Sequence, residues 1–405
     1  MVNQGKQKIL ILIPNLGRGG AQRIFHQQLR FLSAEYTVVG CVFNFDGAFP
    51  EDHLPDILSL NIPAGKNILE KVFFFWKRVQ AVNRIKKNQQ IAISISHLEG
   101  ADYVNLLSGK YEKTICWIHG SKVADQNISG WLGWLRKSIF IPFLYKRSNY
   151  LVAVSKELRM ELIREFKLEP EKIKSIYNGV DLSEIQNKKA EGLRGDIDEL
   201  FIKNNILITH GRLAEQKNLL SLLGVFNSLE PDSKTKLVIL GDGELRSKLL
   251  ERCHTLGFKV YSVWSGEPFN ENYGVYFFGY QKNPYPFLTK ATLYLLTSSW
   301  EGFPLSLCEA MACGLPVLAA DCPTGPKEII ESEAMSYHPV LNPYFSTCGV
   351  LMPMAGPRSY PIWSRTIKDL LKNKILREKL VLGGLARVQS FDEREIVTQW
   401  IKILQ

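Results

Sequence analysis

Short apolar runs alternate with longer helical patterns along most of this chain, and this alternation limits the possible folds more than any other feature. In the first half, the runs that we expect to form strands are residues 9–14, 37–43, 91–96, 114–118, 151–154 and 173–177. Helical patterns separate them, for example at residues 21–33 and 69–87. Strands that alternate with helices form right-handed βαβ units around a parallel sheet. The first half therefore predicts an α/β domain with a doubly wound parallel sheet.

The alternation stops and then starts again, which predicts a second domain of the same class. Residues 184–199 are polar and charged and show no apolar period, which is typical of a linker. Strand-like runs resume at residues 206–209, 237–240, 275–278, 293–296 and 316–319. A chain of 405 residues is also too long for one ordinary core. We therefore expect one domain at residues 1–180, a second at 181–388, and a final amphipathic segment at 389–405.

The positive charge lies in one half of the chain. Residues 1–190 contain 27 Lys and Arg against 17 Asp and Glu, whereas residues 191–405 contain 23 of each. A one-sided basic surface attracts polyanions, either nucleic acid or an anionic membrane. No nucleic-acid-binding module is recognisable, so we expect no nucleic-acid partner. Residues 69–87 and 131–147 mix aromatic with basic side chains, which suits either an anionic membrane surface or a helix packed on the sheet with a basic outer face.

The cysteines and the apolar segments point to the cytoplasm. The seven cysteines form no C-x-x-C pair, and most lie in apolar contexts, which is typical of reduced thiols. The first apolar run is only six residues long and ends at Pro14, so we predict a strand there and not a signal peptide. No segment has the roughly 18 to 20 apolar residues that a transmembrane helix needs.

Two carboxylates separated by seven residues mark the strongest candidate site, in the segment 301–309 that reads EGFPLSLCE. Glu301 follows a strand-like run, and Pro304 suits the first turn of a helix that carries Glu309 on its second turn. The N–H groups at the start of this helix would form an anion site. They belong to Phe303, Leu305 and Ser306. Two acids beside an anion site suit a sugar joined to a phosphate.

Two cations follow the first strand of the second domain. They are Arg212 and Lys217, in the segment 210–218 that reads HGRLAEQKN. Fixed cations at a strand end suit a diphosphate, which needs about two charges neutralised as it leaves.

These two motifs resemble the Glu-x7-Glu and Gly-Arg-x4-Lys-Asn signatures of the retaining GT-B glycosyltransferases of family 4. The resemblance spans nearly the whole chain and is strongest from residue 210 to residue 328. It implies two Rossmann-like domains that face each other across a cleft, with the helix at 389–405 crossing back onto the first domain. It also implies that the first domain binds the acceptor and the second binds a nucleotide-sugar.

The same resemblance implies roles for the candidate residues. Glu309 would hold the ribose hydroxyls of the donor, and Glu301 would contact the hydroxyls of the donor sugar. Arg212 and Lys217, together with the helix start at residues 303–306, would stabilise the departing diphosphate. A divalent metal and a further cofactor are not needed in such a site, because these cations neutralise the phosphates.

Five further positions also take their roles from the resemblance. Gly19 and Gly20, in a loop whose spacing differs from the dinucleotide motif G-x-G-x-x-G, would approach the donor from the first domain. His119 ends a predicted strand and would contact the sugar, with a side chain suited to proton handling near neutrality. Gly241 and Gly279 would line the nucleotide.

Three other features are weaker. His97 and Glu99 follow the strand expected at 91–96 and are candidates for the acceptor side. The Asp-x-Asp string at residues 196–198 lies in the expected linker, so we interpret it as solvated. We find no His, Cys and carboxylate cluster with metal-ligand spacing. The turn at residues 320–328, ADCPTGPKE, resembles one found in transferases that build bacterial surface glycans.

The resemblance therefore implies a hexosyltransferase that moves a UDP-linked hexose or N-acetylhexosamine, with retention of configuration, to a lipid-linked glycan in surface polysaccharide biosynthesis. We expect it in the cytoplasm, as a peripheral protein at the inner face of the membrane. Two alternatives are a GT-B nucleotide-sugar epimerase and a non-catalytic nucleotide-sugar-binding protein. The first would not need a basic, aromatic first domain, and the second would not need Glu301 or His119.

Overall fold

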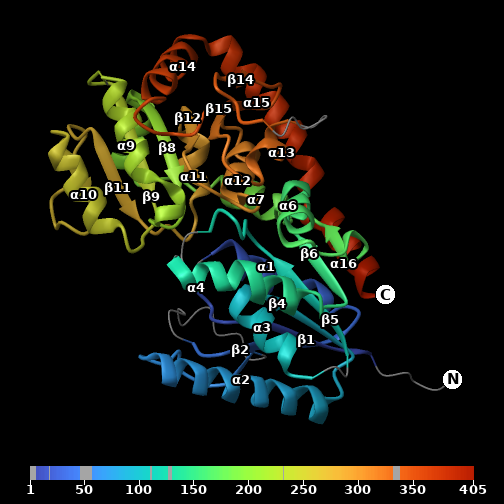
Figure 1. Ribbon diagram of the computed structural model, residues 1–405. Helices are drawn as coiled ribbons and strands as arrows, with labels where there is room; N and C mark the ends of the chain where they lie inside the picture. Colours follow the sequence, from blue (N-terminus) through green and yellow to red (C-terminus); the bar gives the residue numbers. More distant parts are fainter. Residues whose placement is uncertain are drawn as a thin grey trace. The chain divides into compact units, whose positions relative to one another are not determined.

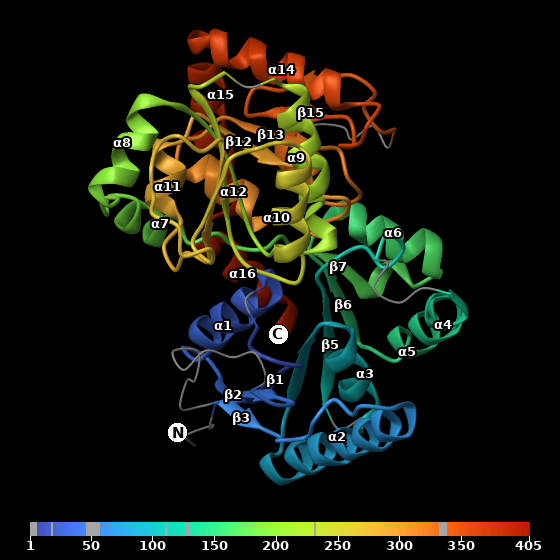
Figure 2. The same ribbon diagram turned by 90° about the vertical axis from the view of Figure 1, so that its left-hand side faces the viewer.

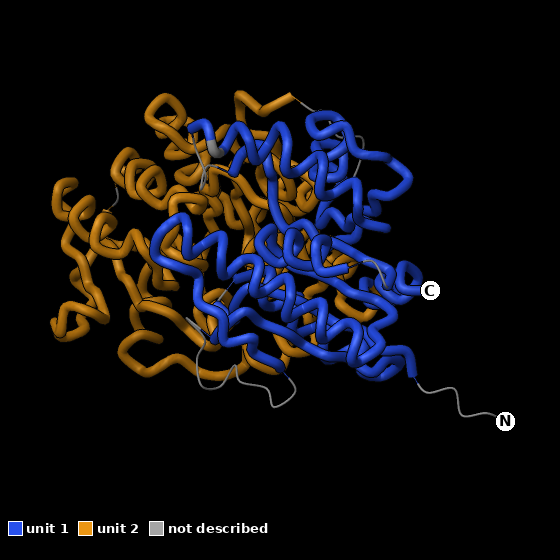
Figure 3. The backbone as a smooth tube through the Cα atoms, turned by 60° about the horizontal axis from the view of Figure 1, so that its bottom comes forward, with its two compact units in different colours: residues 1–178, 396–405 blue, residues 179–395 orange. Residues whose placement is uncertain are grey.

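The computed structural model describes residues 6–17, 19–45, 57–109, 112–125, 130–230, 232–331 and 338–405. The chain divides into two compact units, which Figure 3 distinguishes by colour. Unit 1 comprises residues 1–178 and 396–405, and unit 2 comprises residues 179–395. Each unit is a largely parallel β-sheet covered by helices (Figure 1). The α/β class that the alternating pattern predicts is therefore confirmed.

Unit 1 is built on a seven-stranded parallel sheet in the order β3-β2-β1-β4-β5-β6-β7. The strands are β1 (Lys8–Ile13), β2 (Thr37–Val42), β3 (Ile57–Ser59), β4 (Ile93–His97), β5 (Lys113–Ile118), β6 (Tyr150–Ala153) and β7 (Ile173–Ser175). The chain moves outward from β1 through β2 and β3, and then outward in the other direction from β4. The carboxyl ends of β1 and β4 are therefore the point at which sheets of this type bind ligands.

The helices of unit 1 cover both faces of this sheet. They are α1 (Gly20–Leu32), α2 (Ile68–Gln89), α3 (Glu99–Leu107), α4 (Gly130–Leu135), the π-helical turn η2 (Arg136–Phe140), α5 (Ile141–Tyr145), α6 (Lys156–Phe166) and the 3-10 turn η3 (Pro170–Lys172). Helices α2 and α3 lie beside each other, as Figure 2 shows, and bury Val82 and Val104 against Leu10 of β1.

The chain ends in α16 (Glu393–Leu404), whose residues from 396 onward belong to unit 1. Trp400 packs edge-on against Trp117 of β5, with ring centroids 5.7 Å apart. The ammonium of Lys113 donates a hydrogen bond to the carbonyl of Ile403 at 2.7 Å. An aromatic contact and a charged hydrogen bond thus attach the last helix to the sheet of unit 1.

Unit 2 is built on an eight-stranded sheet in the order β10-β11-β9-β8-β12-β13-β15-β14, in which only β14 is antiparallel to its neighbour. The strands are β8 (Asn205–His210), β9 (Thr235–Leu240), β10 (Val260–Ser262), β11 (Val275–Gly279), β12 (Leu293–Leu296), β13 (Val317–Ala320), β14 (Tyr344–Phe345) and β15 (Val350–Met352). Leu207, Leu237 and Leu293 lie at the centre of its core. The switch point is at β8, between β9 and β12.

The helices of unit 2 follow the same alternation. They are α7 (Leu182–Lys188), α8 (Gly195–Lys203), η4 (Glu215–Lys217), α9 (Leu219–Ser228), α10 (Arg246–Thr255), α11 (Tyr285–Lys290), α12 (Leu305–Ala312), α13 (Pro326–Ile330), α14 (Tyr360–Lys372), α15 (Lys374–Val388) and η5 (Gln389–Phe391).

The linker predicted at residues 184–199 is wrong, because α7 and α8 occupy much of this stretch. Asp181 caps α7 by accepting a hydrogen bond from the N–H of Glu184 at 2.7 Å. Each helix buries only two side chains, which is too few to produce a visible apolar period. They are Leu182 and Ile185 in α7, and Leu200 and Phe201 in α8.

The strands β3, β10, β14 and β15 have only two or three residues each and were not predicted, whereas β7, which is equally short, was. The π-helical turn η2 interrupts the helical pattern expected at 131–147. Among the residues described, no helix is both long and apolar enough to cross a bilayer.

Candidate active site

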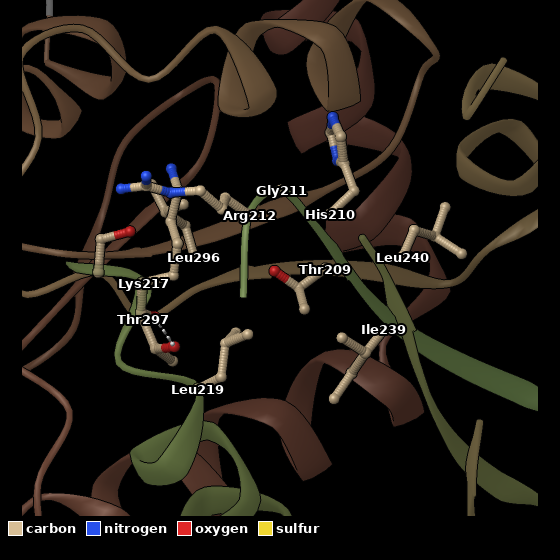
Figure 4. Close-up of a pocket in the computed structure, with 11 residues that line it drawn as sticks. Thr209, His210, Gly211, Arg212, Lys217, Leu219, Ile239, Leu240, Leu296 and Thr297 are labelled. Atoms are coloured by element: carbon tan, nitrogen blue, oxygen red, sulfur yellow. Dashed lines mark hydrogen bonds between the residues drawn. The ribbon is translucent and has the colours of Figure 1, made fainter. Parts of the chain in front are cut away.

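A pocket opens at the carboxyl ends of β8, β9 and β12 in unit 2 (Figure 4). It lies at the switch point of the sheet, where the strand order favours ligand binding. Its lining residues are Thr209, His210, Gly211, Arg212, Lys217, Leu219, Ile239, Leu240, Leu296, Thr297 and Ser298. The structure therefore brings both predicted cations, Arg212 and Lys217, into one pocket.

Glu301 lies beside this pocket and is held by three donors. Its Oε1 accepts hydrogen bonds from Lys217 Nζ at 2.7 Å and from Ser298 Oγ at 2.6 Å. Gln216 Nε2 donates to the other oxygen at 3.3 Å. Glu301 is buried, so its carboxylate and the Lys217 ammonium form an ion pair shielded from bulk water. Such charge-assisted hydrogen bonds fix both side chains in direction.

A second turn buttresses the one that carries Glu301. The Glu301 N–H donates to the carbonyl of Pro323 at 3.1 Å, and the Thr324 hydroxyl donates to the Glu301 carbonyl. Gly325 has a φ of +98°, and a Cβ there would lie 2.7 Å from Cδ of Pro304. Only glycine fits at this close approach. The turn at 320–328 thus positions the Glu301 segment, a role that spacing alone did not reveal.

Glu309 lies on α12 and pairs with a histidine that the sequence did not single out. Its Oε2 lies 2.7 Å from Nε2 of His210, the last residue of β8, and Tyr285 OH lies 3.5 Å from its Oε1. Both acidic residues of the 301–309 segment are thus buried at the carboxyl edge of the sheet, each beside a basic partner from the β8–α9 region. The position of His210 at the end of the first strand of the unit was the available signal.

The start of α12 is one residue later than predicted, because Pro304 is its N-cap and not part of its first turn. The helix begins with Leu305 and Ser306, whose N–H groups belong to the first turn, where no carbonyl of the same helix is available to them. Phe303 precedes the cap and packs edge-on against Phe391 at 5.0 Å. The predicted anion-binding N–H groups therefore lie in or next to the first turn of this helix.

Three glycines lie next to one another at the ends of β8, β9 and β11. The Gly241 N–H donates to the Gly279 carbonyl at 2.7 Å, and a Cβ on Gly241 would lie 1.8 Å from the carbonyl oxygen of Gly211. Gly241 and Gly279 have φ angles of +137° and +69°. The backbone of this edge is bare of side chains at three neighbouring strand ends, which allows a ligand to approach it closely.

In unit 1, Gly19 is the N-cap of α1 and Gly20 is its first residue. The N–H of Gly19 donates to the carbonyl of Gly17 in a tight turn. Arg18 of the same loop lies outside the described residues. The two glycines therefore occupy the turn after β1, on the carboxyl side of the sheet.

His119 follows β5, and its ring joins a buried polar chain. Its Nε2 lies 2.8 Å from Nδ1 of His97, whose Nε2 lies 2.9 Å from Oε1 of Gln28. His97 is fully buried, and its two ring nitrogens face His119 and Gln28. Gln28 was not singled out, because a glutamine within a helical pattern carries no signal of its own.

Glu99, a weaker candidate for the acceptor side, belongs to a charge network. Arg136 of η2 binds both of its oxygens at 2.6 Å, Lys122 lies 3.3 Å away, and the Tyr103 hydroxyl donates to it at 2.6 Å. Burial opposes the ionised form, but Lys122 and Arg136 prevail and hold the pKa of Glu99 at about 2. The carboxylate thus serves to anchor the π-helical turn.

The Asp-x-Asp string lies in the first turn of α8, where Asp196 pairs with Arg194 and Asp198 with Lys290. Within the described ranges, no group of three or more His, Cys, Asp or Glu side chains is arranged to hold a metal ion.

Comparison with known proteins assigns both halves of the chain to one group of enzymes. A family model described as Glycosyl transferases group 1 matches residues 196–381, and one described as Glycosyltransferase Family 4 matches residues 18–184. The chain belongs to the family 4 glycosyltransferases.

Individual relatives agree with this family assignment. The chain is 28% identical to an uncharacterized glycosyltransferase of Methanocaldococcus jannaschii, over 84% of this chain and 86% of that protein. It is 25% identical to the N-acetylgalactosamine-N,N'-diacetylbacillosaminyl-diphospho-undecaprenol 4-alpha-N-acetylgalactosaminyltransferase of Campylobacter jejuni, over 98% and 99% of the two chains.

The solved structures show the shared fold. Anabaena HepE in complex with UDP and glucose is 18% identical, with a TM-score of 0.74 over 98% of this glycosyltransferase and 99% of that chain. A sucrose-phosphate synthase from Thermosynechococcus elongatus has a TM-score of 0.73 at 18% identity, with 98% of each chain covered. The GT-B fold that the motifs imply is thereby confirmed.

Proposed function

We propose that this glycosyltransferase moves a hexose or N-acetylhexosamine from a UDP-sugar to a lipid-linked glycan, with retention of anomeric configuration. The observation that carries the proposal is the pocket of unit 2, which Arg212, Lys217 and Gly211 line, together with the buried carboxylate of Glu301, which pairs with Lys217 beside it. Cations suit the diphosphate, a carboxylate suits sugar hydroxyls, and bare backbone allows a nucleotide to approach.

Unit 2 is the donor-binding unit in this proposal. Glu309 accepts the ribose hydroxyls, and Gly241 and Gly279 line the nucleotide. Arg212, Lys217 and the first N–H groups of α12, at Leu305 and Ser306, neutralise the diphosphate as it leaves. The Lys217–Glu301 pair at 2.7 Å supports this arrangement, because it places the cation next to the carboxylate that holds the sugar.

The proposed transfer proceeds directly from donor to acceptor, without a covalent enzyme intermediate. The bond between the sugar C1 and the donor phosphate oxygen breaks, and a bond forms between C1 and the acceptor hydroxyl oxygen on the same face. The acceptor proton passes to the leaving diphosphate, so UDP and the extended glycan are the products. Preorganised cations supply the stabilisation of the developing charge.

Unit 1 is the acceptor unit, and two exposed apolar surfaces support a lipid-linked acceptor at an anionic membrane. The α2 stripe consists of side chains that share one side of the helix and are at least half exposed: Ile68, Leu69, Val72, Phe73 and Trp76. Lys77 lies over the Phe73 ring at 4.6 Å. Farther along the same helix, Val79 and Val82 are buried in the core of unit 1, so α2 packs through its later turns and exposes apolar side chains in its first turns.

The second surface runs along α4, η2 and α5. Trp131, Trp134 and Phe143 are more than 60% exposed, and Lys137 and Lys146 lie on the same segment. Exposed aromatic side chains beside lysines suit the headgroup region of an anionic membrane. The resemblance to the Campylobacter enzyme, named for an undecaprenol-linked substrate, also favours a lipid-linked acceptor. The proposed location is the inner face of the cytoplasmic membrane.

A nucleotide-release assay tests the proposal. The enzyme is incubated with UDP-, GDP- and ADP-sugars, with and without a bacterial extract of lipid-linked glycans. We expect UDP release that rises with the extract. Epimerised nucleotide-sugar without release would show an epimerase, and tight nucleotide binding without turnover of any donor would show a binding protein.

A further inference from the structure

Three side chains from different elements of unit 1 form a buried hydrogen-bonded chain that ends at His119. Gln28 lies on α1, His97 is the last residue of β4, and His119 follows β5. We infer that Gln28 and His97 are positioning residues that hold His119 as the Nε2–H tautomer, so that its Nδ1 accepts a hydrogen bond from a hydroxyl group of a sugar substrate. The identity of the ligand rests on the proposed function, whereas the tautomer does not.

The hydrogen-bond roles follow from the amide at the start of the chain. In the structure the Gln28 amide presents Oε1 to His97 Nε2 at 2.9 Å, while its own Nε2 has no hydrogen-bond partner among the described residues. An amide oxygen only accepts, so in this orientation His97 Nε2 carries the hydrogen. A neutral imidazole has a single N–H, which leaves His97 Nδ1 as an acceptor. His119 Nε2, 2.8 Å away, must then donate to it, and Nδ1 of His119 keeps its lone pair.

The imidazole rings of His97 and His119 are both neutral at physiological pH. Burial lowers the pKa of His97 well below its usual value, and the neighbouring His119 acts in the same direction. Burial and the Lys122 ammonium lower the pKa of His119 to about 3. Lys122 itself pairs with Glu99, while Phe25 and Trp117 present only aromatic rings to His97. Neither histidine therefore gains a proton between pH 6 and pH 8.

The end of the chain is unsatisfied. Nδ1 of His119 is buried and has no hydrogen-bond partner among the residues that the structure describes. A buried acceptor without a partner destabilises the protein, and a hydrogen bond from a ligand hydroxyl would remove that cost.

Nitrogen-15 NMR of the histidine-labelled protein tests the tautomer directly. We expect His119 to show a nitrogen without hydrogen at Nδ1 and an N–H at Nε2, unchanged from pH 8 to pH 6. A Gln28 amide with its nitrogen toward His97 would donate to it and reverse both tautomers. That result would overturn the inference whatever sugar the enzyme transfers.

The variant Gln28→Glu tests the effect on the reaction. A carboxylate next to His97 favours its protonated form, in which His97 Nδ1 donates to His119 Nε2 and moves the hydrogen of His119 to Nδ1. We expect kcat/KM of this variant to fall at least tenfold from pH 8 to pH 6, while the wild-type profile stays flat. Gln28→Met, which has no ionisable group, is the matched control and should keep a flat profile.

In Gln28→Glu at pH 6, the substrate whose KM rises is the one that binds His119. A rise confined to the nucleotide-sugar assigns the hydroxyl to the donor, and a rise confined to the glycan assigns it to the acceptor. A Gln28→Glu enzyme with the wild-type pH profile and both KM values unchanged would contradict the inference. Expected tautomers in a protein that transfers no sugar would instead contradict the proposed function.

Discussion

Residues far apart in the sequence meet at the pocket of unit 2, and only part of this could be predicted from their spacing. Glu301 and Glu309 were singled out for their seven-residue spacing, and Lys217 because its segment follows the first strand of the second domain. Their partners were not, because a hydrogen bond such as Glu309–His210 depends on side-chain directions that a motif does not specify. The direct contact between Lys217 and Glu301, at 2.7 Å, likewise could not be predicted from the sequence.

Arg212 provides a prediction at this scale. It lines the pocket and is exposed, so its guanidinium is free to follow a diphosphate. We expect Arg212→Ala to lower kcat by about 10²–10³, the range for one lost transition-state donor. Steady-state kinetics with the preferred UDP-sugar measure this. Arg194→Ala, an exposed arginine paired with Asp196 outside the pocket, is the control and should keep its rate; an equal loss in both would dismiss the role of Arg212.

At the scale of elements, long runs were predicted well and short ones were missed. Strands of four or more residues bury enough apolar side chains to stand out, whereas β10 and β14 do not. Helices α7 and α8 were mistaken for a linker because most of their residues face water. These segments lack a dense apolar period, because α7 relies on its Asp181 cap and both helices on a few tertiary contacts.

The glycine edge of β8, β9 and β11 makes a prediction about packing. Gly241→Ala must both strain a φ of +137° and push away the Gly211 carbonyl, 1.8 Å from the new Cβ. Gly257→Ala strains a φ of +76° with open space around it. We expect Gly257→Ala to lower the free energy of unfolding by about 1 kcal/mol and Gly241→Ala by more. Chemical denaturation measures both; equal losses would show that the close approach is unimportant.

The α2 stripe makes a prediction about membrane binding. Replacing Phe73 and Trp76 with serine removes two exposed aromatic side chains, each worth about 1.5–3 kcal/mol when buried. We expect at least tenfold weaker sedimentation with vesicles of phosphatidylglycerol and phosphatidylcholine. Leu382→Ser on α15, an even more exposed apolar side chain that belongs to unit 2, is the control. Unchanged binding of the double variant would remove α2 from the membrane contact.

For the whole molecule, the repeated α/β pattern and the uneven charge could both be recognised from the sequence. Each unit has one sheet with its own switch point, as the restarted alternation indicated. The hydrogen-bonded side chains of unit 1 could not be predicted, because Gln28, His97 and His119 are spread over 91 residues and meet through the packing of α1 and the register of β4 and β5. Such networks become visible only when neighbouring strands are aligned.

Buried titratable groups in unit 1 predict how stability depends on pH. The pKa values of His97 and His119 are lowered, so the unfolded chain binds more protons and stability falls as pH drops through about 6.5. Burial raises the pKa of Asp102 to about 7, so this group acts in the opposite direction between pH 7 and pH 4. We therefore expect Asp102→Asn to lose stability more steeply than wild type from pH 7 to pH 5, by up to about 1.4 kcal/mol per pH unit. Urea denaturation at each pH measures the slope, and identical slopes would contradict the assignment.

The most direct test of the account is the stereochemistry of transfer to a synthetic polyprenyl-diphosphate-linked glycan. The enzyme is given this acceptor with the UDP-sugar that releases most UDP, and proton NMR of the isolated product reports the configuration of the new bond. We expect one added sugar with the anomeric configuration of the donor. An inverted product, or UDP release without any new glycosidic bond, would contradict it.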